Sequence, residues 1–216
     1  MLQENEDARF RSLLNDFDLQ ELDGDCATIY GMWADLRLAF TNREWFRFAA
    51  ENGGGEQFAA KWGSGRCVLD SVAAPLRPFF AENYRRCLSE LRPWQHTYEC
   101  SSADRFRKYC MKVYPLGNGE GLLVINSLRV ESQHSRISSA PLIDRYCTQA
   151  GIFTQCCHCR CMRRVENPRM WDWVPDWVRE SPEGTSHGIC PKCVAFYYSK
   201  SRPEKLILPF STIDQQ

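Results

Sequence analysis

Apolar residues recur at helical spacing near the start of the chain. Phe10, Leu13, Leu14 and Phe17 follow the i, i+3, i+4, i+7 pattern, while acidic residues and Asn15 occupy the opposite face. The pattern predicts an amphipathic helix. We expect it to pack on its own domain or on a second copy of the chain. A membrane is a poorer partner, because anionic lipid would repel the acidic face.

Two groups of predicted strands follow this helix. Residues 26–33 and 36–41 are rich in residues that favour extended structure, and the turn at Ala34-Asp35 separates them. Three further strands are predicted later in the chain, over residues 94–100, 105–114 and 122–130. The glycine-rich segment 116–121 predicts a hairpin between the last two.

Three helices are predicted between the two groups of strands. The first opens at Asn42 and ends at the glycines after Asn52, because glycine tolerates the left-handed backbone that closes a helix. A short helix covers residues 68–72 and a longer one covers residues 76–91. The order β-β-α-α-α-β-β-β predicts an α+β domain with a five-stranded antiparallel sheet and helices across one face.

Composition narrows the class of protein. The chain has 216 residues, 44% of them hydrophobic, and a formal net charge of zero, which argues against a general nucleic-acid binder. The first seven residues are acidic and do not resemble a secretion signal, and no apolar run reaches the length that spans a membrane. Twelve cysteines in such a chain indicate a reducing, cytoplasmic location.

Two C-x-x-C pairs carry the clearest chemical signal. Cys156 and Cys159 form the first pair, and Cys190 and Cys193 form the second. Each C-x-x-C turn aims two thiolates at one point, so two turns supply the four soft ligands of a tetrahedral zinc site. Buried free cysteines and a thioredoxin-type redox pair are the alternatives, but redox chemistry needs only one pair. Four thiolates fill the coordination sphere, which favours a structural zinc over a catalytic one.

Other residues near the pairs leave the ligand set partly open. His187 lies three residues before Cys190, and we expect it to support the metal from the second shell rather than bind it. Cys157 and Cys161 add two thiols beside the first pair, so a ligand or redox role stays open for them. The six scattered cysteines are predicted to be small core residues: Cys26, Cys67, Cys87, Cys100, Cys110 and Cys147.

Roughly the last third of the chain resembles the cysteine-rich module attached to some bacterial PAS-type sensory proteins, which reads C-x-x-C-[KR]…W…S-H-G-[IL]-C-P-x-C. The matching residues are Cys156, Cys159, Arg160, Trp171, Trp173, Trp177 and the segment 186–193. We expect the tryptophans to cover the zinc site and fill its small core, with a partner-binding aromatic patch as the alternative.

The first half resembles a PAS domain over residues 23–132. The landmarks are Asn42 after the second strand, the segment 65–70 before the long helix, and the glycine turn before the last strand. The resemblance implies a module that senses a ligand or dimerises. Haem is not favoured, since residues 76–91 contain no histidine, and flavin is not favoured, since residues 65–70 lack the asparagine and glutamine of light-sensing relatives. An unidentified small ligand in an apolar pocket remains open.

These patterns divide the chain into five segments: an amphipathic helix (1–22), a PAS-like sensory domain (23–132), a linker with a short helix (133–150), a zinc-binding module resembling a zinc ribbon (151–198) and a tail (199–216). Neither Gly-x-Ser-x-Gly nor His-Glu-x-x-His occurs, and we expect no enzyme activity. The predicted function is a cytoplasmic sensory or adaptor protein of bacterial signal transduction that binds a signalling protein, a second copy of itself, or both. The alternative is a zinc-finger-type regulator that binds nucleic acid through the basic cluster Arg160–Arg164.

Overall fold

The computed structural model describes residues 8–51 and 62–199. The acidic start of the chain, the glycine end predicted after Asn52 and most of the predicted tail lie outside the described residues. Among the residues that are described, no helix is both long enough and apolar enough to cross a membrane.

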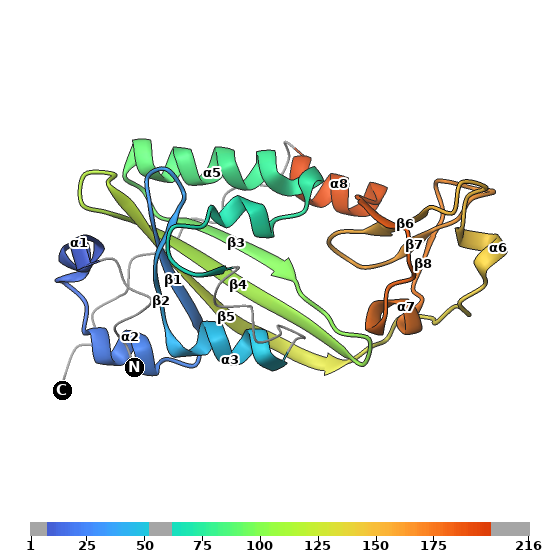
Figure 1. Cartoon of the computed structure of the whole chain (residues 1–216), viewed down its shortest axis with the longest axis horizontal. Coiled ribbons are helices and arrows are strands. Elements are labelled where there is room, and N and C mark those ends of the chain that lie inside the picture. The colour runs from blue at the N-terminus through green and yellow to red at the C-terminus, as the bar shows by residue number, and fades with distance from the viewer. Residues whose placement is uncertain (1–7, 52–61, 200–216) are drawn as a thin grey trace, which may run out of the picture.

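A five-stranded antiparallel sheet forms the larger unit (Figure 1). Its strands lie in the order β2-β1-β5-β4-β3. Their bounds are β1 Thr28–Trp33, β2 Leu38–Thr41, β3 Trp94–Glu99, β4 Arg105–Leu116 and β5 Gly121–Gln133. This confirms the predicted α+β class. The last strand runs further than its pattern indicated and takes in the first residue of the predicted linker.

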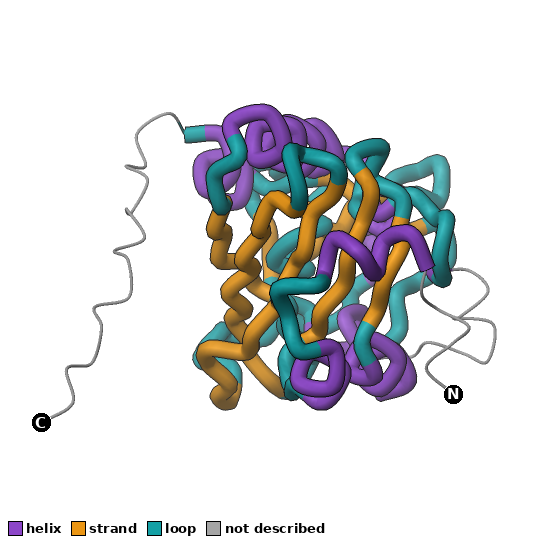
Figure 2. The backbone as a smooth tube through the Cα atoms, turned by 90° about the vertical axis from the view of Figure 1, so that its left-hand side faces the viewer, coloured by secondary structure: helices purple, strands orange, loops and turns teal. Residues whose placement is uncertain are grey.

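The helical segments between β2 and β3 pack on one face of this sheet. They are α3 (Arg43–Glu51), the 3-10 turns η2 (Val68–Ser71) and η3 (Ala74–Leu76), and α5 (Arg77–Glu90). The predicted helix over residues 68–72 is therefore a 3-10 turn. Tyr84 and Cys87 of α5 join Met32 and Val113 of the sheet in one buried cluster. In the view of Figure 2, helical segments lie at the upper and lower ends of the strands as drawn.

The N-terminal helix predicted as one element is broken. It forms α1 (Ala8–Arg11), the 3-10 turn η1 (Ser12–Leu14) and α2 (Leu19–Gly24). The break occurs because the Asp18 side chain accepts hydrogen bonds from the backbone N–H groups of Gln20 (2.8 Å) and Glu21 (3.3 Å) and so starts a new helix. Phe17 is left partly exposed beside this cap.

Phe10 and Leu14 are fully buried against the second face of the sheet. They pack with Ile29 of β1, whereas Met32 of the same strand joins the helices on the first face. Side chains alternate between the two faces of a strand, so β1 contributes to two cores at once. The N-terminal segment therefore covers the face that α5 leaves open; self-association through it stays a prediction.

Gly31→Ala should lower the free energy of unfolding by about 1–3 kcal/mol, because the face of β1 at that position is already filled. A methyl group at Gly31 would lie 2.7 Å from the Phe10 Cζ atom and closer still to its Cε1 atom. The matched control is Gly24→Ala, where nothing lies within 4 Å. Urea unfolding measures both. Equal stability of the two variants would mean that Phe10 does not pack against β1 in solution.

The smaller unit is a four-stranded sheet with three short helices. The strands lie in the order β8-β7-β6-β9, and β6 and β9 run parallel. Their bounds are β6 Phe153–Cys156, β7 Met162–Arg163, β8 Trp171–Asp172 and β9 Thr185–Gly188. The helices are α6 Ile143–Tyr146, α7 Pro175–Arg179 and α8 Pro191–Tyr198. Figure 1 shows α8 returning from this unit toward the end of α5.

Candidate metal centre

The two C-x-x-C pairs meet at one point in the smaller unit. The Sγ atoms of Cys156, Cys159, Cys190 and Cys193 all lie within 4.8 Å of one another. The Cys159 and Cys190 sulfurs are 3.7 Å apart, and all four side chains are buried. The four cysteines predicted from the sequence are therefore brought together, and they could hold a metal ion.

Local backbone structure aims these thiols. Cys156 ends β6, and the turn after it closes when the Arg160 N–H donates to the Cys156 carbonyl at 3.0 Å. Arg160 adopts a left-handed backbone with φ 63°, which lets the turn fold back within a few residues. Cys190 caps α8, with Pro191 at the first helical position, and its N–H donates to the Cys156 sulfur at 3.4 Å. That N–H stabilises a thiolate at Cys156.

Four touching thiols cannot all ionise without a countercharge. Hydrogen bonds from Cys159, then Cys190 and Cys193, hold the pKa of Cys156 far below its usual value. The reciprocal contact with Cys156 raises the pKa of Cys159 to about 12, and contacts with Cys156 also raise the pKa values of Cys190 and Cys193. A divalent cation relieves this conflict, because it stabilises every thiolate at once. The donor set therefore fits a thiophilic metal.

The two extra thiols lie beside this cluster without being part of it. Burial raises the pKa of Cys157 to about 11. Cys161 packs against the four-cysteine cluster, and a hydrogen bond from Cys159 lowers its pKa. A redox or ligand role for either thiol stays untested.

His187 lies in β9 opposite Gln155 of β6, and its side chain is exposed. We expect His187→Ala to keep one zinc ion per chain, because its ring is not among the four clustered groups. The expected effect is faster release of the metal to a chelator, measured with a chromogenic chelator beside elemental analysis. A variant that purifies without metal would mean that the imidazole replaces one thiolate.

The tryptophans were expected to cover the metal site and fill the small core of the module, and two of the three do so, whereas Trp173 does not. Trp171 packs against the four cysteines. Trp177 packs on Phe153, with ring centroids 5.2 Å apart. Trp173 is buried toward the larger unit, where its ring lies 4.4 Å from that of His134.

Two residues of the basic cluster are engaged inside the module. The Arg160 Nε donates to the Gln155 Oε1 at 3.0 Å. Arg164 donates two hydrogen bonds to Asp172, at 2.6 and 3.0 Å, and this ion pair lowers the pKa of Asp172. Arg163 is half-buried in β7. The cluster therefore has a structural role that its charge alone did not indicate.

The prediction for the scattered cysteines is partly wrong. Cys87 and Cys110 are buried in the larger unit, as expected, and Cys67 and Cys147 are half-buried. Cys26 and Cys100 are exposed. Cys26 precedes β1 and Cys100 follows β3, so both lie at strand ends, where the alternation of buried and exposed positions no longer applies.

Arg136 was not singled out by any motif, yet it connects the metal site to the larger sheet. One guanidinium nitrogen donates to the Cys159 carbonyl at 2.9 Å, and another donates to Glu99 at 2.6 Å. The guanidinium also lies over the Trp173 ring, 4.7 Å from its centroid. Arg136 belongs to the polar segment predicted as a linker, and no local pattern distinguishes it from the other polar residues there.

Comparison with known proteins identifies no family. No family model matches the chain, and no curated protein matches it. Among solved structures, the PAS domain of BvgS from Bordetella pertussis matches 53% of this chain and 82% of its own, with 17% identity and a TM-score of 0.39. The PAS domain of an HTR-like protein from Haloarcula marismortui matches 56% of this chain and 96% of its own, with 16% identity and a TM-score of 0.31.

A third match is the phage VqmA–DPO complex, with 13% identity and a TM-score of 0.38. It covers 59% of this chain, and this chain spans 56% of that protein's length. At these identities and TM-scores, the matches do not assign this chain to a family.

Proposed function

We propose that the chain is a non-enzymatic sensory or adaptor protein of bacterial signal transduction. In this proposal a PAS-like sheet domain is coupled to a structural zinc module, and the module contacts a partner. The observation that carries the proposal is the cluster of four buried thiols, built into a module that also contacts the sheet domain through Arg136.

A structural role for zinc follows from the ligand set. Zinc prefers four ligands in a tetrahedron, with sulfur about 2.3 Å from the metal, and four cysteines complete that sphere. A catalytic zinc keeps a position open for water, whereas this cluster offers four thiols, one for each position. The metal would cross-link the two C-x-x-C turns, and the residues packed around it would maintain the fold of the module.

Exposed apolar side chains support a partner-binding role for the module. Ile143 of α6 is 62% exposed, and Met170, beside β8, is 44% exposed. The backbone of Val165 lies close to both residues. Its N–H donates to the carbonyl of Arg145, two residues after Ile143, and the N–H of the preceding residue, Arg164, donates to the Met170 carbonyl. Several large apolar side chains exposed on one small unit are typical of a surface that binds another protein.

Native mass spectrometry of the full chain, purified without added metal, tests this function. We expect one zinc ion per chain, together with a retained small molecule, a dimer or a co-purified protein partner. A chain without zinc would contradict the proposal. Salt-dependent binding to duplex DNA that Arg163→Ala weakens would instead favour the nucleic-acid regulator.

A further inference from the structure

Helix α8 connects the four-cysteine cluster to the larger unit. Its first turn carries two of the four thiols, with Cys190 as the capping residue and Cys193 inside the helix. Its last turn carries Phe196, Tyr197 and Tyr198. The helix has eight residues, and helices shorter than about 12 residues are marginal without outside support. Each end of α8 therefore depends on what holds the other end.

The last turn of α8 rests on the larger unit through aromatic contacts. The Phe79 ring of α5 lies 4.9 Å from that of Tyr197, which is buried, and 6.1 Å from that of Tyr198. The Tyr198 hydroxyl donates to the Pro75 carbonyl at 2.7 Å. His96 of β3 packs on the same residues, with its ring 5.3 Å from Tyr197. These contacts join segments more than one hundred residues apart in the sequence.

The first C-x-x-C turn reaches the same aromatic residues. His158 lies between Cys156 and Cys159, and its Nδ1 is 2.8 Å from the Tyr197 hydroxyl. Its ring also stacks on Phe196, with centroids 5.3 Å apart and an interplanar angle of 20°. Arg136 also connects this turn to the larger unit, since it donates to both the Cys159 carbonyl and Glu99 at the end of β3. Both C-x-x-C turns are thus attached to the larger unit, near strand β3.

We propose that metal binding and the docking of α8 on α5 and β3 form one coupled latch. A metal held by the four thiols fixes the first turn of α8. Forming this first turn is the costly step of helix formation, so the metal also stabilises the last turn, whose aromatic residues pack on Phe79 and His96. Loss of the metal releases α8 and exposes the aromatic surface of the larger unit. This inference rests on the proposed zinc site and adds a route by which metal binding at that site affects the larger sheet.

Coupling between two sites is reciprocal. If the metal stabilises the docked helix, then the docked helix must hold the metal more tightly by the same factor. A change on α5, far from the thiols, should therefore alter metal retention. This requirement separates a latch from two units that merely touch.

Release of zinc from the full chain to a chromogenic chelator tests the latch. Phe79→Ala should speed release by about three- to tenfold, since it removes the ring contacts to α8. Phe48→Ala is the matched control: Phe48 lies on α3 and packs on Tyr109, with ring centroids 6.1 Å apart, and we expect it to release zinc at the wild-type rate. If Phe79→Ala also releases zinc at the wild-type rate, the latch is overturned.

Hydrogen exchange supplies the second readout. Chelation of the wild-type metal should raise exchange in residues 77–90 and 94–99 together with residues 191–198, while β4 and β5 stay protected. Increased exchange confined to residues 151–198 would overturn the latch. If Phe79→Ala does not fold, Tyr198→Phe replaces it, because this change removes only a hydroxyl group, and release should then be about twofold faster. A wild-type chain without zinc overturns the proposed function itself, whereas stoichiometric zinc with unchanged release overturns the latch alone.

Discussion

Cys190→Ala should purify without stoichiometric zinc and should unfold the last third of the chain. The Cys190 thiol is one of the four clustered groups, and the residue directly precedes α8, whose Cys193 supplies another of them. Binding of structural zinc contributes about 10–16 kcal/mol in small zinc domains near neutral pH, so the loss of one ligand removes most of what holds such a module together. Elemental analysis measures the metal, and hydrogen exchange across residues 151–198 measures the folding.

The matched controls for Cys190→Ala are Cys157→Ser and Cys161→Ser. Both thiols lie beside the cluster but outside the four groups that meet within 4.8 Å. We expect both variants to keep one zinc ion per chain and to leave the exchange pattern of the module unchanged. Loss of metal from either would show that the ligand set includes an adjacent thiol. Full zinc retention by Cys190→Ala would refute the four-cysteine site.

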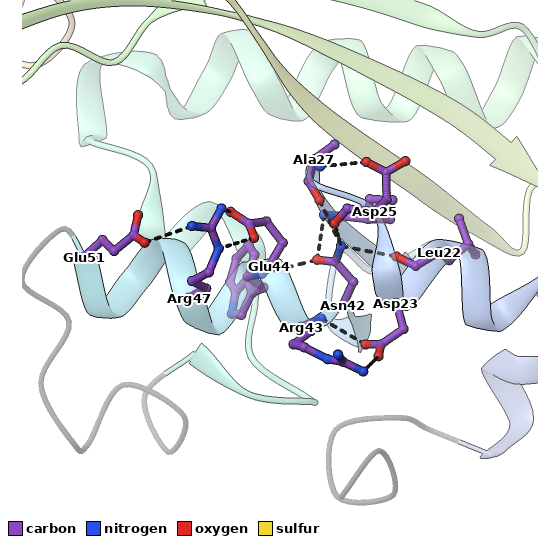
Figure 3. Close-up of polar contacts among 11 residues, drawn as sticks. Leu22, Asp23, Asp25, Ala27, Asn42, Arg43, Glu44, Arg47 and Glu51 are labelled. Atoms are coloured by element: carbon purple, nitrogen blue, oxygen red, sulfur yellow. Dashed lines mark hydrogen bonds and ion pairs between the residues drawn. The ribbon is translucent and has the colours of Figure 1, made fainter.

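Asn42→Ala should lower the free energy of unfolding by about 3–4 kcal/mol, a loss typical of breaking a buried polar network. The Asn42 side chain is fully buried, and Figure 3 shows the polar contacts around it. Its Oδ1 accepts hydrogen bonds from the backbone N–H groups of Ile29 at 3.0 Å and Trp45 at 3.2 Å. Its Nδ2 donates to the Ala27 carbonyl at 2.8 Å and the Leu22 carbonyl at 3.2 Å. Alanine leaves these groups without the partner that satisfied them.

Asn83→Ala is the control for this change in urea unfolding. Asn83 lies in α5, and its Nδ2 donates to the carbonyl of Phe79 in the same helix at 2.8 Å. Because that carbonyl already belongs to a helix and alanine favours helices, we expect Asn83→Ala to change stability by under about 1 kcal/mol. Equal effects of the two substitutions would mean that the Asn42 network does not form in solution.

The sequence predicted features that depend on short stretches of backbone. The spacing of Cys156 and Cys159 places two thiols on one turn whatever surrounds it, so the pairs could be recognised directly. Alternation and turn residues likewise predicted the five strands. Asn42 was recognised as a landmark of the resemblance, but its network joins α2, β1 and α3, and no local pattern reports such contacts.

The N-terminal segment shows where a local pattern can mislead. The apolar residues at helical spacing predicted one helix that includes Phe17, whereas the Asp18 cap starts a second helix there. Periodicity shows which face of a helix is apolar, but it does not detect a capping residue that starts a new helix. Aspartate followed by a new helical run was the signal that could have revealed the break.

The five strands of the larger sheet and the two C-x-x-C pairs were determined by the sequence itself, because each follows from backbone period or turn geometry within a few residues, and the α+β class follows from the order of these strands and the helices between them. Tertiary structure alone decided which face the N-terminal segment covers, that Arg136 ties Cys159 to Glu99, and that α8 rests on Phe79. Those contacts join segments tens to more than one hundred residues apart. Side-chain packing and charge pairing between distant segments determine these contacts, and neither produces a periodic pattern along the chain.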